Sequence, residues 1–241
     1  MATRNPADRL DSAKDAERLL DHYGIVLRYA ATKGVPLASL RSAAGPADSK
    51  AALALSIELT NHLLATAIGI EVNVVADRLA LVHRTLLPSL YALVRRGRAA
   101  DDLDGLSVHA RSAYALLRQR RQISAGDLRK HLGLKTEPRN DPAYEALAEL
   151  QRALLVTRGP FEMPKKGIPY LPPEGYPYYL LVERHAELPT AARKLSVERA
   201  TDLWLDRYLS AAPPVTPRKL VSLFRRFLTA DEIARALARR G

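Results

Sequence analysis

The sequence contains no cysteine, and its six histidines are scattered. Without cysteine the chain forms no disulfide and offers no thiolate ligand to a metal ion. No two histidines stand four residues apart, the spacing that lets one helix face hold a metal ion. The phosphate-binding motif GxxxxGK[ST], the dinucleotide motif GxGxxG and the hydrolase motif GxSxG are also missing. The sequence therefore predicts no metal site and no cofactor.

Long apolar runs are missing as well. Residues 51–70 form the most apolar stretch, but Glu58, Asn61 and His62 interrupt it. A membrane-spanning helix carries such residues only at a high energetic cost. The first residues also lack the apolar centre of a signal peptide. We therefore expect a cytoplasmic protein that has no membrane partner.

Acidic residues are fewer than basic residues. There are 37 Lys and Arg against 26 Asp and Glu, which gives a formal net charge of +11. A surface with this excess attracts polyanions such as DNA, RNA or an anionic membrane face. An Arg- and Ala-rich composition without a binding role is the alternative. The hydrophobic fraction of 47% is large enough for real cores, so the chain is a folded protein.

Two segments share one pattern, at residues 123–128 and 215–220. Each has an apolar residue, a hydroxyl residue suited to capping a helix (Ser124 or Thr216), three small or polar positions and a leucine. Ser124 with Asp127 also resembles a capping box. Amphipathic segments flank both copies, at residues 108–119 and 143–154 and at residues 197–209 and 231–239. This order of three helices is typical of helix-turn-helix modules.

Two short apolar segments, residues 154–157 and 178–182, follow the third helix of the first copy and favour two antiparallel strands. The loop between them is rich in proline and would form a long wing. The second copy ends with little or no wing. We therefore predict a mainly α fold with small β elements (α+β), built from tandem winged helix-turn-helix modules.

The predicted domains follow from these elements. The N-terminal region has patterns for helices at 12–23, 36–44, 49–68 and 86–95, for a strand at 25–29, and for a hairpin at 71–75 and 79–82. A charged segment with two glycines then marks a boundary. The predicted division is a disordered tail (1–11), an N-terminal α/β region (12–97), a linker (98–106), a winged-helix module (107–188) and a second helix-turn-helix module (189–241).

The candidate DNA contacts lie mainly on the wing. The third helix of the first module exposes two acids, Glu145 and Glu149, whereas a helix that reads guanine usually presents arginine or lysine. Positive and aromatic side chains on the wing suit phosphate contacts and base stacking better. The predicted DNA-binding residues are Arg158, Lys165, Lys166, Tyr170, Arg152 and Arg121.

Several segments resemble small proteins that are distant relatives of the AlkZ (YcaQ) DNA glycosylases. They are residues 16–40, with YGIVL at 23–27 and KGVPLASL at 33–40, the stretch LPSLYAL at 87–93, and the helix end at 147–155. The resemblance covers most of residues 13–240 and implies tandem winged-helix modules around DNA. Those glycosylases carry a Gln-x-Gln or Gln-x-Asp motif, which Gln119, Gln122 and Gln151 do not form. The resemblance therefore supports DNA binding and leaves base excision open.

Three hypotheses follow from the sequence. The first is a winged-helix protein that binds duplex DNA through phosphate contacts and shape, without the usual catalytic motif. The second is a DNA glycosylase for alkylated or bulky-adduct bases that uses an atypical carboxylate, with Asp101, Asp102 and Asp104 as the candidate catalytic residues. The third is a protein-interaction module, with a possible homodimer formed by an exposed face around Tyr144 and Tyr91.

Overall fold

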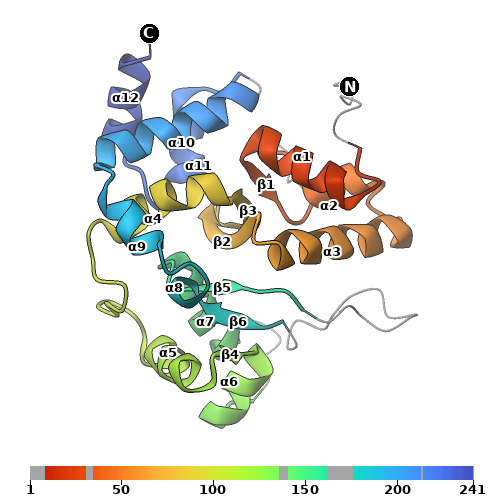
Figure 1. The fold of residues 1–241 in the computed structure, drawn as a ribbon, viewed down its shortest axis with the longest axis vertical. Coiled ribbons are helices and arrows are strands. Elements are labelled where there is room, and N and C mark those ends of the chain that lie inside the picture. The colour runs from red at the N-terminus through yellow and green to blue at the C-terminus, as the bar shows by residue number, and fades with distance from the viewer. Residues whose placement is uncertain (1–8, 31–34, 136–140, 162–175, 213, 241) are drawn as a thin grey trace.

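A computed structural model describes residues 9–30, 35–135, 141–161, 176–212 and 214–240. The described chain has two lobes, each built around a three-stranded antiparallel sheet (Figure 1). The upper lobe contains α1 (Ala13–Tyr23), β1 (Ile25–Leu27), α2 (Leu40–Ala44), α3 (Lys50–Ala65), β2 (Gly69–Val75), β3 (Arg78–His83), a 3₁₀ turn (Arg84–Leu86), α4 (Leu87–Arg95), α9 (Leu188–Arg193), α10 (Val197–Ala211), α11 (Pro217–Phe224) and α12 (Ala230–Ala238). The lower lobe contains α5 (Val108–Arg120), β4 (Gln122–Ile123), α6 (Ala125–Leu132), α7 (Pro142–Arg152), β5 (Val156–Arg158), β6 (Tyr178–Leu180) and α8 (Leu181–Arg184). The predicted α+β class is confirmed.

Hydroxyl caps start many of the helices where the sequence places them. The hydroxyl of Ser12 accepts a hydrogen bond from the backbone N–H of Asp15 at the start of α1. Ser124 and Asp127 form both hydrogen bonds of the predicted capping box at α6. α2 begins after Ser39, later than the predicted start at Pro36, because the Ser39 hydroxyl accepts the N–H of Ser42.

The upper sheet has the strand order β1-β3-β2, which leaves β2 at an edge. Its register pairs Val26 and Glu71 with Leu81, so these side chains share one face. The apolar members of that face pack against α1 and α3. The opposite face carries Ile25, Ile70 and their neighbours, and packs against α4 and the C-terminal helices. Both faces of this sheet are therefore buried.

The lower lobe has its own core and a sheet in the order β4-β6-β5. The short strand β4, which the sequence analysis did not predict, pairs with β6. Asp141 caps the start of α7, and its Oδ2 lies 2.8 Å from Nη2 of Arg129 on α6. This buried ion pair links α6 to the start of α7.

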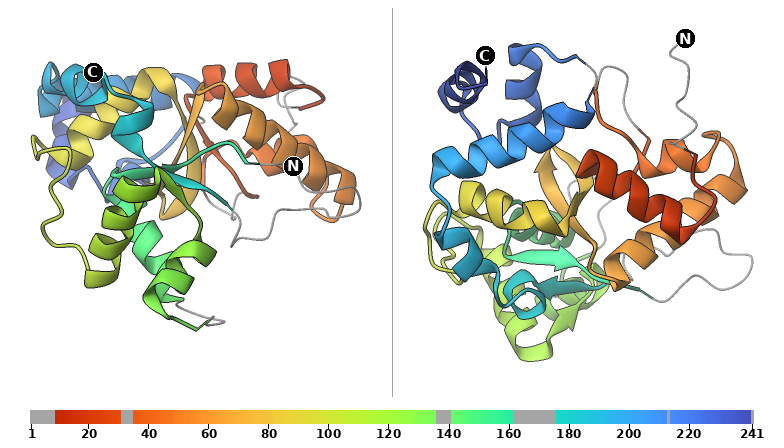
Figure 2. Two further views of the ribbon diagram at one scale, coloured as in Figure 1. Left: turned by 60° about the horizontal axis from the view of Figure 1, so that its bottom comes forward. Right: turned by 45° about the horizontal axis from the view of Figure 1, so that its top comes forward.

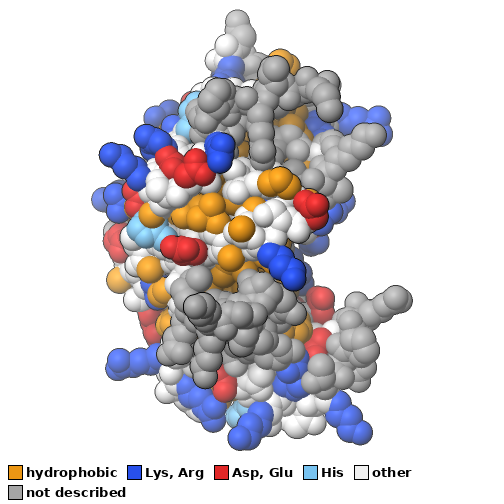
Figure 3. Space-filling view, turned by 90° about the vertical axis from the view of Figure 1, so that its right-hand side faces the viewer, with side chains coloured by type: hydrophobic (Ala, Val, Ile, Leu, Met, Phe, Trp, Pro, Cys, Tyr) orange, Lys and Arg blue, Asp and Glu red, His pale blue; other side chains and the backbone are white. Residues whose placement is uncertain are grey.

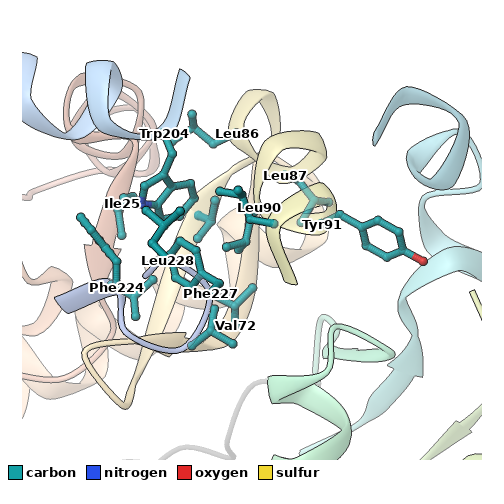
Figure 4. Close-up of a cluster of buried hydrophobic side chains, with 14 of the residues drawn as sticks. Ile25, Val72, Leu86, Leu87, Leu90, Tyr91, Trp204, Phe224, Phe227 and Leu228 are labelled. Atoms are coloured by element: carbon teal, nitrogen blue, oxygen red, sulfur yellow. The ribbon is translucent and has the colours of Figure 1, made fainter. Parts of the chain in front are cut away.

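After β6 the chain returns to the upper lobe through α8 and α9, two short helices that the sequence analysis did not predict. α10 then lies along α4 (Figure 1 and Figure 2). Trp204 on α10 is fully buried and meets Phe224 and Phe227 edge to face (Figure 4). The three C-terminal helices thus share one core with the upper sheet. The division of the chain at residues 98–106 stays a prediction.

Two further expectations concern the N-terminus and the membrane. Of the tail expected over residues 1–11, residues 1–8 lie outside the described part of the chain. Leu10 is buried, and its N–H donates to the carbonyl oxygen of Ala43 at 3.2 Å. Among the described residues, no helix combines the length and apolar character needed to cross a bilayer.

Candidate nucleic-acid interface

A fully buried carboxylate joins the two lobes. Glu71 lies on the edge strand β2 and is 0% exposed. Its Oε2 is 2.7 Å from Nη1 of Arg28, and its Oε1 is 3.3 Å from Nε of Arg158. Burial acts to raise the pKa of Glu71, but the positive charges of Arg158 and Arg28 outweigh it and hold that pKa below its ordinary value. Glu71 is therefore an anion at neutral pH, shared between two buried cations.

The backbone of Glu71 fastens the lower lobe to the edge of the upper sheet. The side-chain amide of Gln151 on α7 donates to the carbonyl oxygen of Glu71 at 3.2 Å. The hydroxyl of Thr157 on β5 donates to the same oxygen at 2.9 Å. A buried edge strand must satisfy its outward polar groups. These two bonds do so, and they set the position of α7 and β5.

Aromatic rings close the cluster around the two arginines. The guanidinium carbon of Arg28 lies 4.7 Å from the ring centre of Tyr176, and that of Arg158 lies 4.9 Å from it. Arg158 Nε also donates to the hydroxyl of Tyr178 at 2.9 Å. Burial raises the pKa of Tyr178, and the charge of Arg158 only partly opposes this. The phenol therefore stays neutral, and the cluster is a closed structural centre.

The predicted DNA-binding residues have different surroundings. Arg158 is buried and faces Glu71, not solvent. Arg152 is half-buried on α7, with Nη2 3.7 Å from an oxygen of Glu145. Arg121 is exposed directly after α5. Lys165, Lys166 and Tyr170 lie outside the described residues.

The aspartates considered as catalytic candidates lie on the surface between the lobes. Asp101 and Asp104 are exposed, and Asp102 is half-buried. One carboxylate oxygen of Asp102 accepts the backbone N–H of Asp104 at 2.8 Å, and the other is 4.0 Å from Nε of Arg98. Asp102 is therefore engaged in fixing its own loop.

A run of cations without ion-pair partners in the described chain lies on α5 and α6. Within residues 107–135, Asp127 is the only acidic residue, and the capping box engages it. Among the described residues, the exposed cations of this segment have no ion-pair partner. Figure 3 shows Lys and Arg side chains at the lower end of the molecule, the end where α5 and α6 lie in Figure 1. We define the α5–α6 basic surface as Arg118, Arg120, Arg121 and Lys130.

The C-terminal helices carry many arginines too, but most of these are neutralised within the chain. Arg225 and Arg226 both pair with Asp77 at the tip of the β2–β3 hairpin. Arg239 Nη2 is 2.6 Å from Asp202, and Arg240 pairs with Asp206. The pairing of Arg225 and Arg226 with Asp77 joins residues far apart in the sequence, and no local pattern indicates it.

The helix α7 is only partly available to a ligand. Gln151 is 1% exposed and is bonded to Glu71, so this part of the helix faces the upper lobe. The residues that remain accessible include Glu145 and Glu149, and Glu149 accepts the N–H and the hydroxyl of Ser107. This acidic side is a poor match for a phosphate backbone.

Sequence reasoning missed the Glu71 cluster, although one signal was present. An acid in the apolar strand that begins at Gly69, and an arginine directly after the apolar strand β1, both require buried partners. That signal points to Glu71 and Arg28. Arg158 could not be found in this way, because it had been assigned to an exposed wing.

One comparison with known proteins gave a match. The fold and the site define only a broad class of protein. It is an α+β protein with a basic helical end and a closed, buried ion cluster. The model of a family described as AlkZ related matches residues 73–225, from within β2 through the lower lobe to just after α11. This range is well over half of the chain, so the protein belongs to the AlkZ-related family, and the resemblance noted in the sequence is confirmed. No curated protein and no solved structure matches the chain.

Proposed function

We propose that this AlkZ-related protein binds duplex DNA through phosphate contacts made by the α5–α6 basic surface. The observation that carries the proposal is that these cations are exposed and unpaired, whereas most C-terminal arginines have carboxylate partners. Unpaired cations are free to replace the counterions condensed on DNA. The relation to AlkZ-type DNA repair proteins supports DNA over other polyanions.

We interpret α5, β4, α6, α7, β5 and β6 as a winged-helix module. The supporting observations are the order of these elements and the pairing of β4 with β6 and of β5 with β6. In this interpretation the module approaches DNA with α5 and α6, because Gln151 and the Glu71 cluster hold the inner side of α7 against β2. Binding then follows the shape and charge of the duplex more than its sequence.

The test replaces Arg118, Arg120 and Arg121 together by alanine. Affinity for duplex DNA should fall roughly tenfold to a hundredfold, and the slope of log affinity against log salt should fall by about one unit per lost contact. Fluorescence anisotropy over a salt series measures both quantities. Arg121 already has a positive φ of 64°, so alanine adds no new backbone strain there, and stability should change by less than about 0.5 kcal/mol.

The matched control is the replacement of Arg235, Arg239 and Arg240 by alanine. It removes the same charge from α12 and the residues after it. The affinity of this control variant for duplex DNA should stay within about threefold of wild type, because salt screens the attraction between charges beyond roughly 8–10 Å. Equal losses in the two triple variants would show diffuse attraction and would contradict the proposal.

The wing is tested separately with Lys165→Ala and Lys166→Ala together. These residues lie outside the described part of the chain, so their contact with DNA rests on the sequence alone. The double variant should keep its melting temperature and bind every DNA sequence more weakly, with a salt slope lower by up to about two units. Unchanged binding would restrict the interface to the α5–α6 basic surface.

A further inference from the structure

A second basic site lies away from the α5–α6 basic surface, between α4 and α9. It is a pocket of about 350 Å³, at the lower end of the size range of small-molecule sites, about 300–1,000 Å³. Its apolar wall includes Ala92, Ala192, Leu195 and Val197. The charged side chains that line it are all arginines: Arg95, Arg96, Arg98 and Arg193. Arg96 pairs with Glu232 and Arg98 with Asp102, so Arg95 and Arg193 are the two without a carboxylate partner among the described residues. An apolar pocket with cations of one sign suits an organic anion.

Arg95 is a buried cation without a carboxylate partner among the described residues. It is 3% exposed. Its terminal nitrogens donate to the carbonyl oxygens of Ala153 at 3.3 Å, of Asp102 at 3.0 Å and of Ala99. Its Nε is buried and has no hydrogen-bond partner. A buried charge of this kind is costly unless an anion approaches it.

Tyr91 supplies a second unused donor beside Arg95. Its side chain leaves the Trp204 core and extends away from Leu87 and Leu90 (Figure 4). Tyr91 is 4% exposed, and its hydroxyl oxygen has no hydrogen-bond partner in the described chain. Burial raises the pKa of Tyr91, while the charge of Arg95, the approach of the Arg95 side chain to the hydroxyl and the charge of Arg193 oppose that rise. The phenol therefore keeps its proton and can donate it to an acceptor. This buried position also removes Tyr91 from the exposed face of the interaction hypothesis.

Other buried arginines show how unusual this arrangement is within the described chain. Arg28, Arg129 and Arg158 each face a carboxylate. Arg41 binds only carbonyl oxygens, but four of them surround it and none of its nitrogens is left buried without a partner. Arg95 alone combines neutral partners, an unused buried N–H and a neighbouring pocket.

We propose that the pocket between α4 and α9 binds a small organic phosphate. Arg193 lies exposed at the pocket with no ion-pair partner in the described chain. On binding, the Tyr91 hydroxyl and Nε of Arg95, both buried in this structure, turn toward the phosphate oxygens and donate hydrogen bonds to them. The apolar body of the ligand lies against Ala192 and Leu195. Charge-assisted bonds from arginine are well suited to phosphate, and the apolar wall selects an ester over free phosphate.

Calorimetric titration of the full chain with phenyl phosphate and with adenosine 5′-monophosphate tests the site. At least one of the two should bind with one site per chain, whereas phenol and adenosine should not. Tyr91→Phe and Arg193→Ala should each weaken binding roughly tenfold or more, since each removes a hydrogen bond or charge from an anion. Arg199→Ala, an exposed residue of α10 outside the pocket, is the control and should bind as wild type does.

Absence of saturable binding of both phosphates at millimolar concentration would overturn the proposal, as would equal weakening by Arg199→Ala. Tyr91→Phe keeps the ring, and its melting curve shows whether the fold is intact. The site is independent of DNA binding: the Arg118/Arg120/Arg121 variant should bind phenyl phosphate normally, and Tyr91→Phe should bind DNA normally. Failure of one proposal is therefore distinguishable from failure of the other.

Discussion

Replacing Glu71 by glutamine should lower the free energy of unfolding by about 3–5 kcal/mol at pH 7, the usual cost of removing one partner from a buried ion pair. Glutamine keeps the size of the side chain but leaves the cations of Arg28 and Arg158 without an anion. Denaturant unfolding followed by circular dichroism measures the change. Glu145→Gln is the control, because its pair with Arg152 is partly exposed and long, at 3.7 Å, and should contribute less than about 1 kcal/mol.

The effect of Glu71→Gln should depend on pH in a defined direction. The pKa of Glu71 is lower in the folded protein than in the unfolded chain, where it is about 4.3. The contribution of Glu71 to the free energy of unfolding is therefore fully present above about pH 4.3. It is lost as the pH falls through the lower pKa of the folded protein. The free energies of unfolding of the wild type and of the variant should differ most near neutral pH and become similar in acid. A constant difference from pH 7 to pH 3 would contradict a charged Glu71.

Trp204→Ala should cost a similar amount, about 3–5 kcal/mol, because it leaves a large cavity in a core that cannot close fully. Trp204 is 0% exposed, and its ring centre lies 5.1 Å from that of Phe227 and 5.8 Å from that of Phe224. Edge-to-face pairs of this kind add about 0.5–1.5 kcal/mol each to the area that is buried. Thermal and denaturant unfolding, followed by circular dichroism, give the loss.

Trp204→Phe separates packing from hydrogen bonding at this position. The indole Nε1 is buried and has no hydrogen-bond partner among the described residues, so phenylalanine removes an unsatisfied donor while it keeps an aromatic ring. Its loss of stability should be clearly smaller than that of Trp204→Ala. Equal losses would mean that the contacts with Phe224 and Phe227 contribute little. Trp204 is the only tryptophan, so its fluorescence reports directly on the upper core of the wild-type protein.

Local signals in the sequence predicted most of the elements. Ser12 and Ser124 mark helix starts by hydrogen bonds to residues three positions ahead, and such short-range chemistry is visible in a single sequence. The two short segments at 71–75 and 79–82, separated by three residues that suit a turn, likewise located β2 and β3. The two-residue strand β4 was missed because two residues carry no periodic pattern, and it exists only through its pairing with β6.

The candidate sites depended on distant partners and were less predictable. Arg158 looks like a wing cation until Glu71, far away in the sequence, is placed beside it. Arg225 and Arg226 look like free charges until the β2–β3 hairpin brings Asp77 to them. Arg121 is exposed, as a contact residue must be, because it directly follows a helix. The sequence shows which residues are charged, whereas the fold decides which charges remain for a ligand.

The upper core takes residues from both ends of the described chain, and this affects the order of events during synthesis. The apolar face of β1, β2 and β3 that carries Ile25 and Ile70 is made early, but Trp204 and Phe224, which cover it, are made only after the whole lower lobe. At ordinary translation rates this interval is on the order of ten seconds. The lower core comes from one continuous segment and has no such delay. The nascent chain therefore carries an uncovered sheet beside a finished lobe, a state that chaperones recognise.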